Sequence, residues 1–103
     1  NLQQIIERTR QRHPDARVLI AGMQIPPNMG SGYAGRFRAI FPDLARRNGV
    51  DLIPFLLEGV GGEPSLNLPD GIHPTARGHE IVAETVWMYL RPILESIRQE
   101  QPA

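Results

Sequence analysis

Asp70 and His73 stand three positions apart in the stretch DGIHPT, residues 70–75, and this spacing permits acid–base chemistry. Gly71, between them, allows a turn that brings the carboxylate within reach of the imidazole Nδ1. An imidazole held in this way keeps Nε2 available to accept a proton, as in a general base oriented by a carboxylate. An ordinary turn ahead of a helix has the same spacing, so the pair alone leaves both interpretations open.

Other reactive groups are scarce in the chain. A metal site built from Asp70, His73 and His79 is a weaker alternative, because its ligands would straddle a helix start and nothing else completes the coordination. We therefore expect no metal and no cofactor.

There is no cysteine, which excludes thiol nucleophiles and disulfides. No Gly-x-Ser-x-Gly elbow surrounds any of the three serines, Ser31, Ser65 and Ser96. Only Ser31 falls in a loop expected to face the site.

Helices and strands alternate along the sequence and must position these residues. The apolar spacing predicts a helix ending near Arg12, a buried strand at 17–23, a helix at 33–47 capped by Asn48-Gly49, a second buried strand at 50–55, and a last helix opening near Thr75 or Ala76. Pro42 and Pro92 are expected to bend their helices. The segments at 24–32 and 56–69 are predicted to be loops.

Two parallel strands and three helices make a poor isolated core, because a parallel sheet needs cover on both faces. Residues 1–103 are therefore predicted to be the C-terminal half of a single three-layer α/β/α domain with parallel strands. In such sheets, chemistry gathers in the loops that leave the carboxyl ends of the strands. DGIHPT closes the second of these loops, which favours the catalytic interpretation of the pair.

The composition excludes several classes of partner. Eleven arginines balance eleven acidic residues in a chain of 103 residues, so net charge does not favour nucleic acid. No apolar run reaches the roughly 18 residues that cross a bilayer, so no integral membrane segment is expected. The first residues, NLQQIIERTRQRHP, lack the layout of a signal peptide and open inside an amphipathic pattern. Composition leaves the cell compartment undecided.

Two stretches resemble a known enzyme family. DGIHPTARGHEIVAETV is similar to the last sequence block of the SGNH (GDSL) hydrolases, and MQIPPNMGSGYAGRFRAIFPDLARRNGVDLIPFLLEGVGG resembles the arylesterase and thioesterase I/lysophospholipase L1 branch. The resemblance implies a flavodoxin-like fold and a serine hydrolase of esters or thioesters. It gives Asp70 the orienting role in a Ser-His-Asp triad, and His73 the role of general base and then general acid.

The resemblance also implies a pocket for a small acyl or aryl group, with ordinary packing as the alternative for each residue. One wall would contain Met23, Ile25, Pro26, Pro27, Asn28 and Met29. The other would contain residues 55–60, among them Phe55 and Leu56, together with Leu66 and Leu68. The expected substrates are small acyl esters or thioesters, and acyl transfer in place of hydrolysis stays open.

The chain departs from the family in one respect. The Gly-Asp-Ser block with the nucleophile, and the Gly and Asn of the oxyanion hole, are absent. We expect them from the N-terminal half of the same domain or from another copy of the chain. The alternative is a non-catalytic fragment, or a binding or assembly module, of the same fold. Relatives of this branch are often exported, so a periplasmic or secreted location is implied by resemblance alone.

Overall fold

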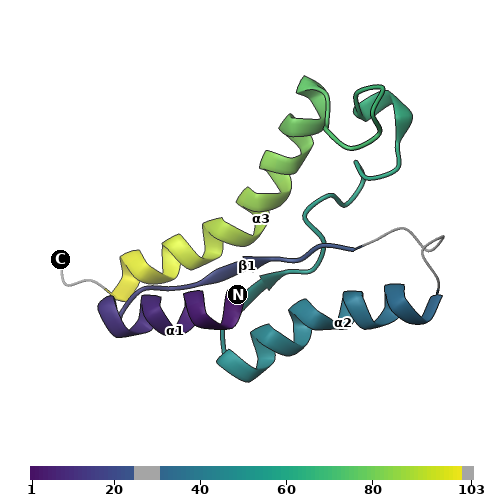
Figure 1. Cartoon of the computed structure of the whole chain (residues 1–103). Coiled ribbons are helices and arrows are strands. Elements are labelled where there is room, and N and C mark those ends of the chain that lie inside the picture. Colours follow the sequence, from purple (N-terminus) through teal and green to yellow (C-terminus); the bar gives the residue numbers. More distant parts are fainter. Residues whose placement is uncertain (25–30, 101–103) are drawn as a thin grey trace. The chain divides into compact units, whose positions relative to one another are not determined.

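The computed structural model describes residues 1–24 and 31–100, and the chain divides into two compact units, Asn1–Pro54 and Phe55–Ala103 (Figure 1). The first unit contains the two strands. In chain order the elements are α1 (Leu2–Arg12), β1 (Leu19–Ala21), α2 (Ser31–Asn48), β2 (Asp51–Ile53), the 3₁₀ helix η2 (Pro64–Leu66) and α3 (Ala76–Glu100). The predicted α/β class is confirmed.

The two strands are parallel, as predicted, and pair Leu19 with Asp51, Ile20 with Leu52 and Ala21 with Ile53. Each has three residues, so the predicted strands at 17–23 and 50–55 were too long. The ladder stops at a defined point. The Gly22 amide donates to the Ile53 carbonyl at 2.8 Å, and this is the last bond of the ladder among the described residues.

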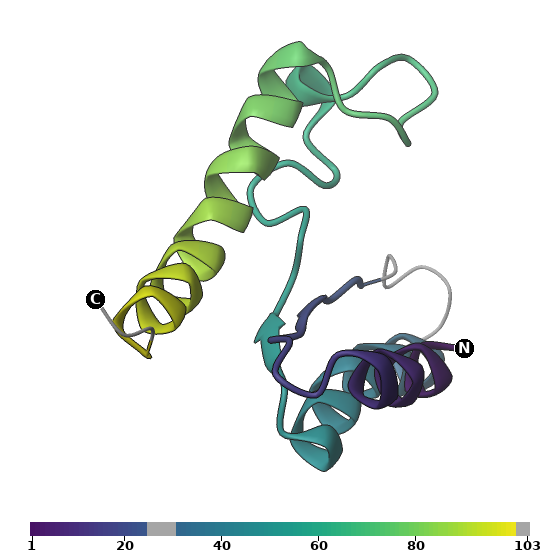
Figure 2. The ribbon, with the colours of Figure 1, turned by 90° about the vertical axis from the view of Figure 1, so that its left-hand side faces the viewer.

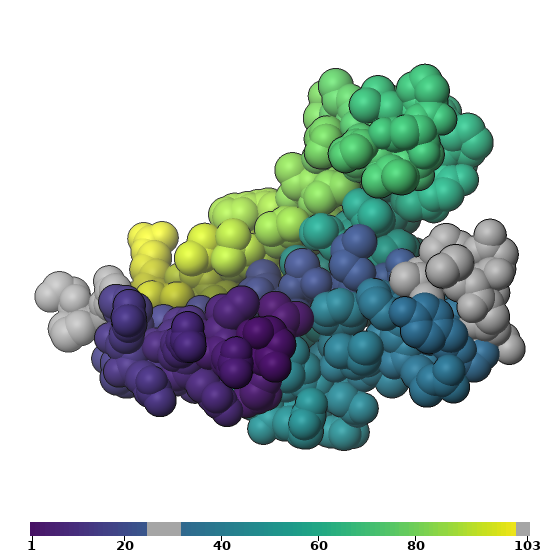
Figure 3. All heavy atoms as spheres, viewed as in Figure 1, coloured from purple at the N-terminus to yellow at the C-terminus, as the bar shows by residue number. Residues whose placement is uncertain are grey.

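The first unit has an apolar core on one face of this sheet. Its buried members are Ile6 from α1, Ile20 from β1, and Leu44 and Ala45 from α2. The partly buried residues Val18, Phe41, Val50 and Leu52 pack against them. Figures 1 and 2 show α1 and α2 side by side beneath the strands, and their atoms adjoin in the space-filling view of Figure 3. The core therefore joins both helices to the sheet.

A pair of amides also ties α1 to α2. Gln3 Nε2 donates to Asn48 Oδ1 at 2.9 Å, and Asn48 Nδ2 donates back to Gln3 Oε1 at 2.7 Å. Asn48 Nδ2 additionally donates to the Leu44 carbonyl at 2.8 Å. These contacts satisfy polar groups next to the core, where an unpaired amide would be costly.

The helix ends follow the sequence signals closely. α1 ends at Arg12 as predicted, and Asn1 caps its start by accepting from the Gln4 amide. α2 ends at Asn48, followed by Gly49 at φ +62°, the left-handed conformation expected of a glycine cap. It begins at Ser31, two residues earlier than predicted. Two helices, α2 and α3, continue through an internal proline, at positions 42 and 92.

The second unit consists of a coiled segment and the long helix α3. The segment at 56–69, predicted to be a loop, contains η2 and a series of turns. α3 opens at Ala76, as predicted, and the Thr75 hydroxyl accepts from the Gly78 amide at 3.1 Å. Val60 and Gly78 are buried where the coiled segment meets the first turns of α3. This junction carries the turn with Asp70 and His73.

Candidate active site

Asp70 and His73 form a close side-chain pair. Asp70 Oδ2 lies 2.6 Å from His73 Nδ1. The second oxygen, Oδ1, accepts from the amides of Ile72 at 2.9 Å and His73 at 3.1 Å. Gly71 adopts φ +70°, a conformation that side chains with a Cβ rarely take, which explains why the turn needs a glycine. Both carboxylate oxygens are thus engaged within a turn of four residues.

The carboxylate of Asp70 is held in its ionised form. Its pKa is lowered from 3.8 to about 2, first by the hydrogen bond with the His73 side chain and then by the amides of Ile72 and His73. An acceptor at Nδ1 places the proton of a neutral imidazole on that nitrogen. Nε2 is then left with its lone pair, and no residue described by the structure hydrogen-bonds to it.

A short antiparallel bridge carries this turn. Asn67 and Pro74 form the bridge, the Leu68 amide donates to the His73 carbonyl at 2.8 Å, and the Thr75 amide donates to the Leu66 carbonyl at 2.8 Å. The pair therefore sits at the tip of a small hairpin, and the end of that hairpin leads directly into α3.

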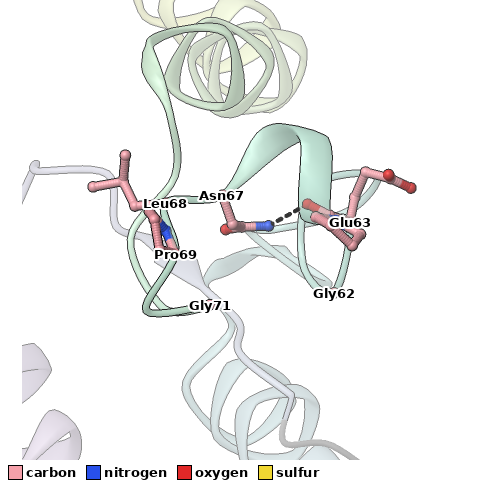
Figure 4. A pocket seen from close by; sticks show the side chains of 7 residues that line it. Gly62, Glu63, Asn67, Leu68, Pro69 and Gly71 are labelled. Atoms are coloured by element: carbon pink, nitrogen blue, oxygen red, sulfur yellow. Dashed lines mark hydrogen bonds between the residues drawn. The ribbon is translucent and has the colours of Figure 1, made fainter.

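An open pocket of about 370 Å³ lies beside the hairpin (Figure 4). It is lined by Gly62, Glu63, Pro64, Asn67, Leu68, Pro69 and Gly71. Residues on both sides of Asp70 thus contribute to the wall. The predicted acyl-wall residue Leu68 lines this pocket, whereas Phe55, Leu56 and Leu66 do not.

The remaining predicted substrate residues divide between the two units. Met23 is half-buried just after β1 in the first unit. Phe55, Leu56 and Leu66 are half-buried in the second unit, where the Phe55 ring lies against Gly61. The other residues of the first wall, Ile25, Pro26, Pro27, Asn28 and Met29, lie outside the described residues. The substrate wall therefore stays a prediction.

The metal alternative finds no support in the part of the chain that the structure describes. There, no group of three His, Asp or Glu side chains is arranged to hold a metal ion. His79 is exposed on α3 and does not join the Asp70–His73 pair. Ser31, the serine expected in a loop, is the first residue of α2.

Sequence reasoning missed one residue of the site, Asn67. Its side chain donates from Nδ2 to the carbonyls of Val60 and Glu63, both at 2.8 Å. The only local signal was an asparagine inside a loop rich in glycine and proline, which by itself indicates a turn.

Comparison with known proteins identifies the family. The model of the GDSL-like lipase/acylhydrolase family matches residues 1–81, a stretch that includes Asp70 and His73. The chain belongs to this family. Esterase TesA of Pseudomonas aeruginosa is 40% identical over 83 residues, covering 81% of this chain and 41% of that protein. The arylesterase of Vibrio mimicus is 38% identical over 71 residues, covering 69% of this chain and 36% of that protein.

A third relative is thioesterase 1/protease 1/lysophospholipase L1 of Escherichia coli K12. It is 34% identical over 80 residues, which cover 78% of this chain and 38% of that protein. The chain thus spans less than half the length of these relatives. The proposed resemblance to the arylesterase and thioesterase branch of the family is confirmed.

Solved structures of the family share this fold. The crystal structure of TesA superposes with a TM-score of 0.80 at 36% identity, covering 88% of this chain and 49% of that one. AlinE4, an SGNH-hydrolase family esterase, gives a TM-score of 0.60 at 36% identity, covering 99% of this chain and 49% of that one. Among the described residues, no helix has the length and apolarity needed to cross a bilayer.

Proposed function

We propose that this chain supplies the acid and the base of a serine hydrolase that cleaves small acyl esters or thioesters. The observation that carries the proposal is the 2.6 Å contact between Asp70 Oδ2 and His73 Nδ1 in a chain of the GDSL-like family. The relatives described as an esterase, an arylesterase and a thioesterase support the same reaction class. The nucleophilic serine comes from polypeptide outside these 103 residues.

The proposed reaction follows from the geometry of the pair. The serine hydroxyl attacks the acyl carbonyl, and His73 Nε2 takes the hydroxyl proton. Asp70 holds the ring through Nδ1 and stabilises the positive charge that the ring acquires. His73 then returns the proton to the departing alcohol or thiol. Water cleaves the acyl-enzyme by the same route, again with His73 as the base.

Exposed apolar side chains next to the pair support an acyl substrate. Ile72, between Asp70 and His73, is 71% exposed, and Leu68 is 47% exposed. Large aliphatic side chains at the surface of a turn gain free energy when an apolar group covers them. We assign the substrate walls to the predicted residues, Met23 with Ile25, Pro26, Pro27 and Asn28 on one side and Phe55, Leu56 and Leu66 on the other.

The edges of the sheet support the proposal that more polypeptide completes the site. Within the residues that the structure describes, β1 and β2 pair only with each other, so each strand has an outer edge without a strand partner. Unpaired strand edges favour the addition of another strand. We assign this place to the N-terminal half of the same domain. A second copy of the chain, or a non-catalytic assembly module, is the alternative outcome.

The test uses the full protein that contains this sequence together with its upstream residues. His73→Ala is expected to lower kcat/KM for p-nitrophenyl acetate by about 10⁴-fold, because a triad loses its base. His79→Ala is the matched control, since His79 is also exposed but does not contact Asp70. Unchanged turnover in His73→Ala would rule out the assigned role. Native mass measurement of the purified protein identifies which polypeptide completes the sheet.

A further inference from the structure

The segment before the catalytic hairpin is a coil held by its own backbone. The amides of Val60 and Gly61 donate to the Leu57 carbonyl at 2.9 and 2.8 Å. The Glu63 amide then donates to the Val60 carbonyl at 3.1 Å, and the Leu66 amide donates to the Glu63 carbonyl at 3.0 Å. These short-range bonds shape the coil. The last of them reaches the start of the hairpin at Leu66, and the Asn67 amide adds a longer bond of 3.5 Å to the Pro64 carbonyl.

Asn67 joins the coil to the hairpin. It is the hairpin residue that bridges to Pro74, and its side chain extends back to the coil. Nδ2 donates one hydrogen bond to the Val60 carbonyl and one to the Glu63 carbonyl, both at 2.8 Å. Figure 4 shows the Asn67 side chain directed toward Glu63, with the latter bond drawn. Both amide hydrogens are therefore used to hold two turns of the coil against the base of the hairpin.

The anchoring position is closely packed on the coil side. Val60 is fully buried, with 0% of its surface exposed. A Cβ added at Gly78 would lie 3.3 Å from the Val60 Cγ1. The Val60 carbonyl that accepts from Asn67 thus belongs to a residue packed against the first turns of α3. Asn67 connects this packed point to the strand that leads into Asp70.

We propose that Asn67 is a positioning residue for His73, and this inference rests on the proposed function. By fixing the base of the hairpin to the coil, Asn67 fixes where the imidazole presents Nε2 to the serine. Asp70 orients the ring within the turn, whereas Asn67 sets the place of the turn itself. Asparagine suits this role because it offers two donors on a short stem. Aspartate has the same shape but would direct a carboxylate at two carbonyl oxygens.

The expected effect falls on kcat. Small misplacements of a catalytic group, and loss of the contacts that orient one, each cost on the order of 10- to 100-fold. Asn67→Ala is therefore expected to lower kcat by about 10- to 100-fold while KM changes less than about 3-fold. Asn67→Asp should lose at least as much, and Asn67→Gln, which keeps both donors, should retain more activity than either.

The controls separate this role from a general effect on the loop. Ser65→Ala removes the Ser65–Glu63 side-chain bond in the same coil and should leave kcat unchanged. The His73 Nδ1 proton, observed by NMR in the full protein, should shift or broaden in Asn67→Ala and not in Ser65→Ala. A loss confined to thermal stability, with kcat and the Nδ1 proton as in the wild type, would assign Asn67 a structural role only and overturn the proposal.

The remaining outcomes are also decisive. If all three Asn67 variants fail to reach the native fold while Ser65→Ala folds, Asn67 is needed for folding and the positioning role is overturned. If His73→Ala keeps its activity, the proposed function fails, whatever the Asn67 variants do. If His73→Ala is inactive and folded Asn67→Ala retains wild-type kcat, only the inference about Asn67 fails.

Discussion

The two units of the chain are ordered by different forces. In residues 1–54 a cluster of apolar side chains from α1, β1 and α2 is almost completely buried, with Ile6 3% and Leu44 5% exposed. In residues 55–103 the turn with Asp70 and His73 is exposed, and its shape comes from hydrogen bonds to backbone groups. Apolar burial is non-directional, whereas a hydrogen bond specifies a distance and an angle.

The first unit therefore mainly determines the stability of the fold, and the second unit mainly determines the geometry of the site. The first unit gains its stability from apolar area removed from water, so it depends on the volume of its side chains. The second unit holds the His73 imidazole beside Asp70 in contact with solvent, and it does so with hydrogen-bond donors and acceptors of the turn. We expect mutations in the first unit to change the free energy of unfolding most, and those in the second to change the site.

The largest stability effect is expected in the core of the first unit. Ile6→Ala should lower the free energy of unfolding by about 2–5 kcal/mol, because it removes buried methyl groups and leaves a cavity. Ile5→Ala is the matched control, since Ile5 is 59% exposed on the same helix, and should cost no more than about 0.5 kcal/mol. Denaturant unfolding measures both. An equal cost at Ile5 would show that α1 is buried on a second face.

Two helical glycines, Gly78 in the second unit and Gly35 in the first, allow the same substitution to be compared between the units. At Gly78, in α3, a Cβ would lie 2.4 Å from the Leu66 carbonyl oxygen and 2.9 Å from the Pro74 Cβ, so α3 would have to move away from the hairpin. Gly78→Ala should cost about 1–3 kcal/mol and lower activity, because both neighbours belong to the junction that carries the pair. At Gly35, in α2, nothing lies within 4 Å of an added Cβ.

Gly35→Ala should therefore stabilise the protein, by about 0.5–1 kcal/mol, because alanine favours the helix. Thermal unfolding and esterase assays of the two variants compare the units directly. A Gly78→Ala protein with native stability and full activity would contradict the close packing at the base of the hairpin.

The smallest effect concerns the ionisation of Asp70. In the wild type its carboxyl should titrate near pH 2, below the ordinary 3.8, when followed by the ¹³C chemical shift. Since the folded state favours the carboxylate, this group stabilises the fold fully above about pH 4 and loses its contribution as the pH falls through 2. His73→Ala should move the midpoint up toward 3.8, because the imidazole is the main cause of the lowered pKa.

The backbone amides of Ile72 and His73 should keep the His73→Ala midpoint somewhat below the ordinary value. Ile72→Ala retains both amides and the imidazole, so its titration should match the wild type. A midpoint that does not move in His73→Ala would show that the contact between the side chains is absent in solution.

Features set by neighbouring residues could be predicted from the sequence. The end of α1 at Arg12, the glycine cap at Gly49 and the opening of α3 at Ala76 depend on local propensities and capping groups. The contact between Asp70 and His73 spans three residues and needs only a glycine turn, so the spacing was sufficient to suggest it. Its catalytic role still awaits the experiment.

Features set by distant residues could not be predicted in this way. The strands are shorter than their apolar runs because the backbone pairing of the two strands decides where the ladder stops. The amide pair of Gln3 and Asn48 joins residues 45 positions apart. Asn67 likewise acts through carbonyls whose positions depend on the packing of Val60.

The sequence by itself determined the family, the order of helices and strands, and the acid–imidazole turn, because each is encoded by residue types at short spacing. Only the tertiary structure decided what fixes that turn to the rest of its unit. Backbone carbonyls are the same in every residue, and a sequence does not reveal which of them a side chain will reach once the chain is folded.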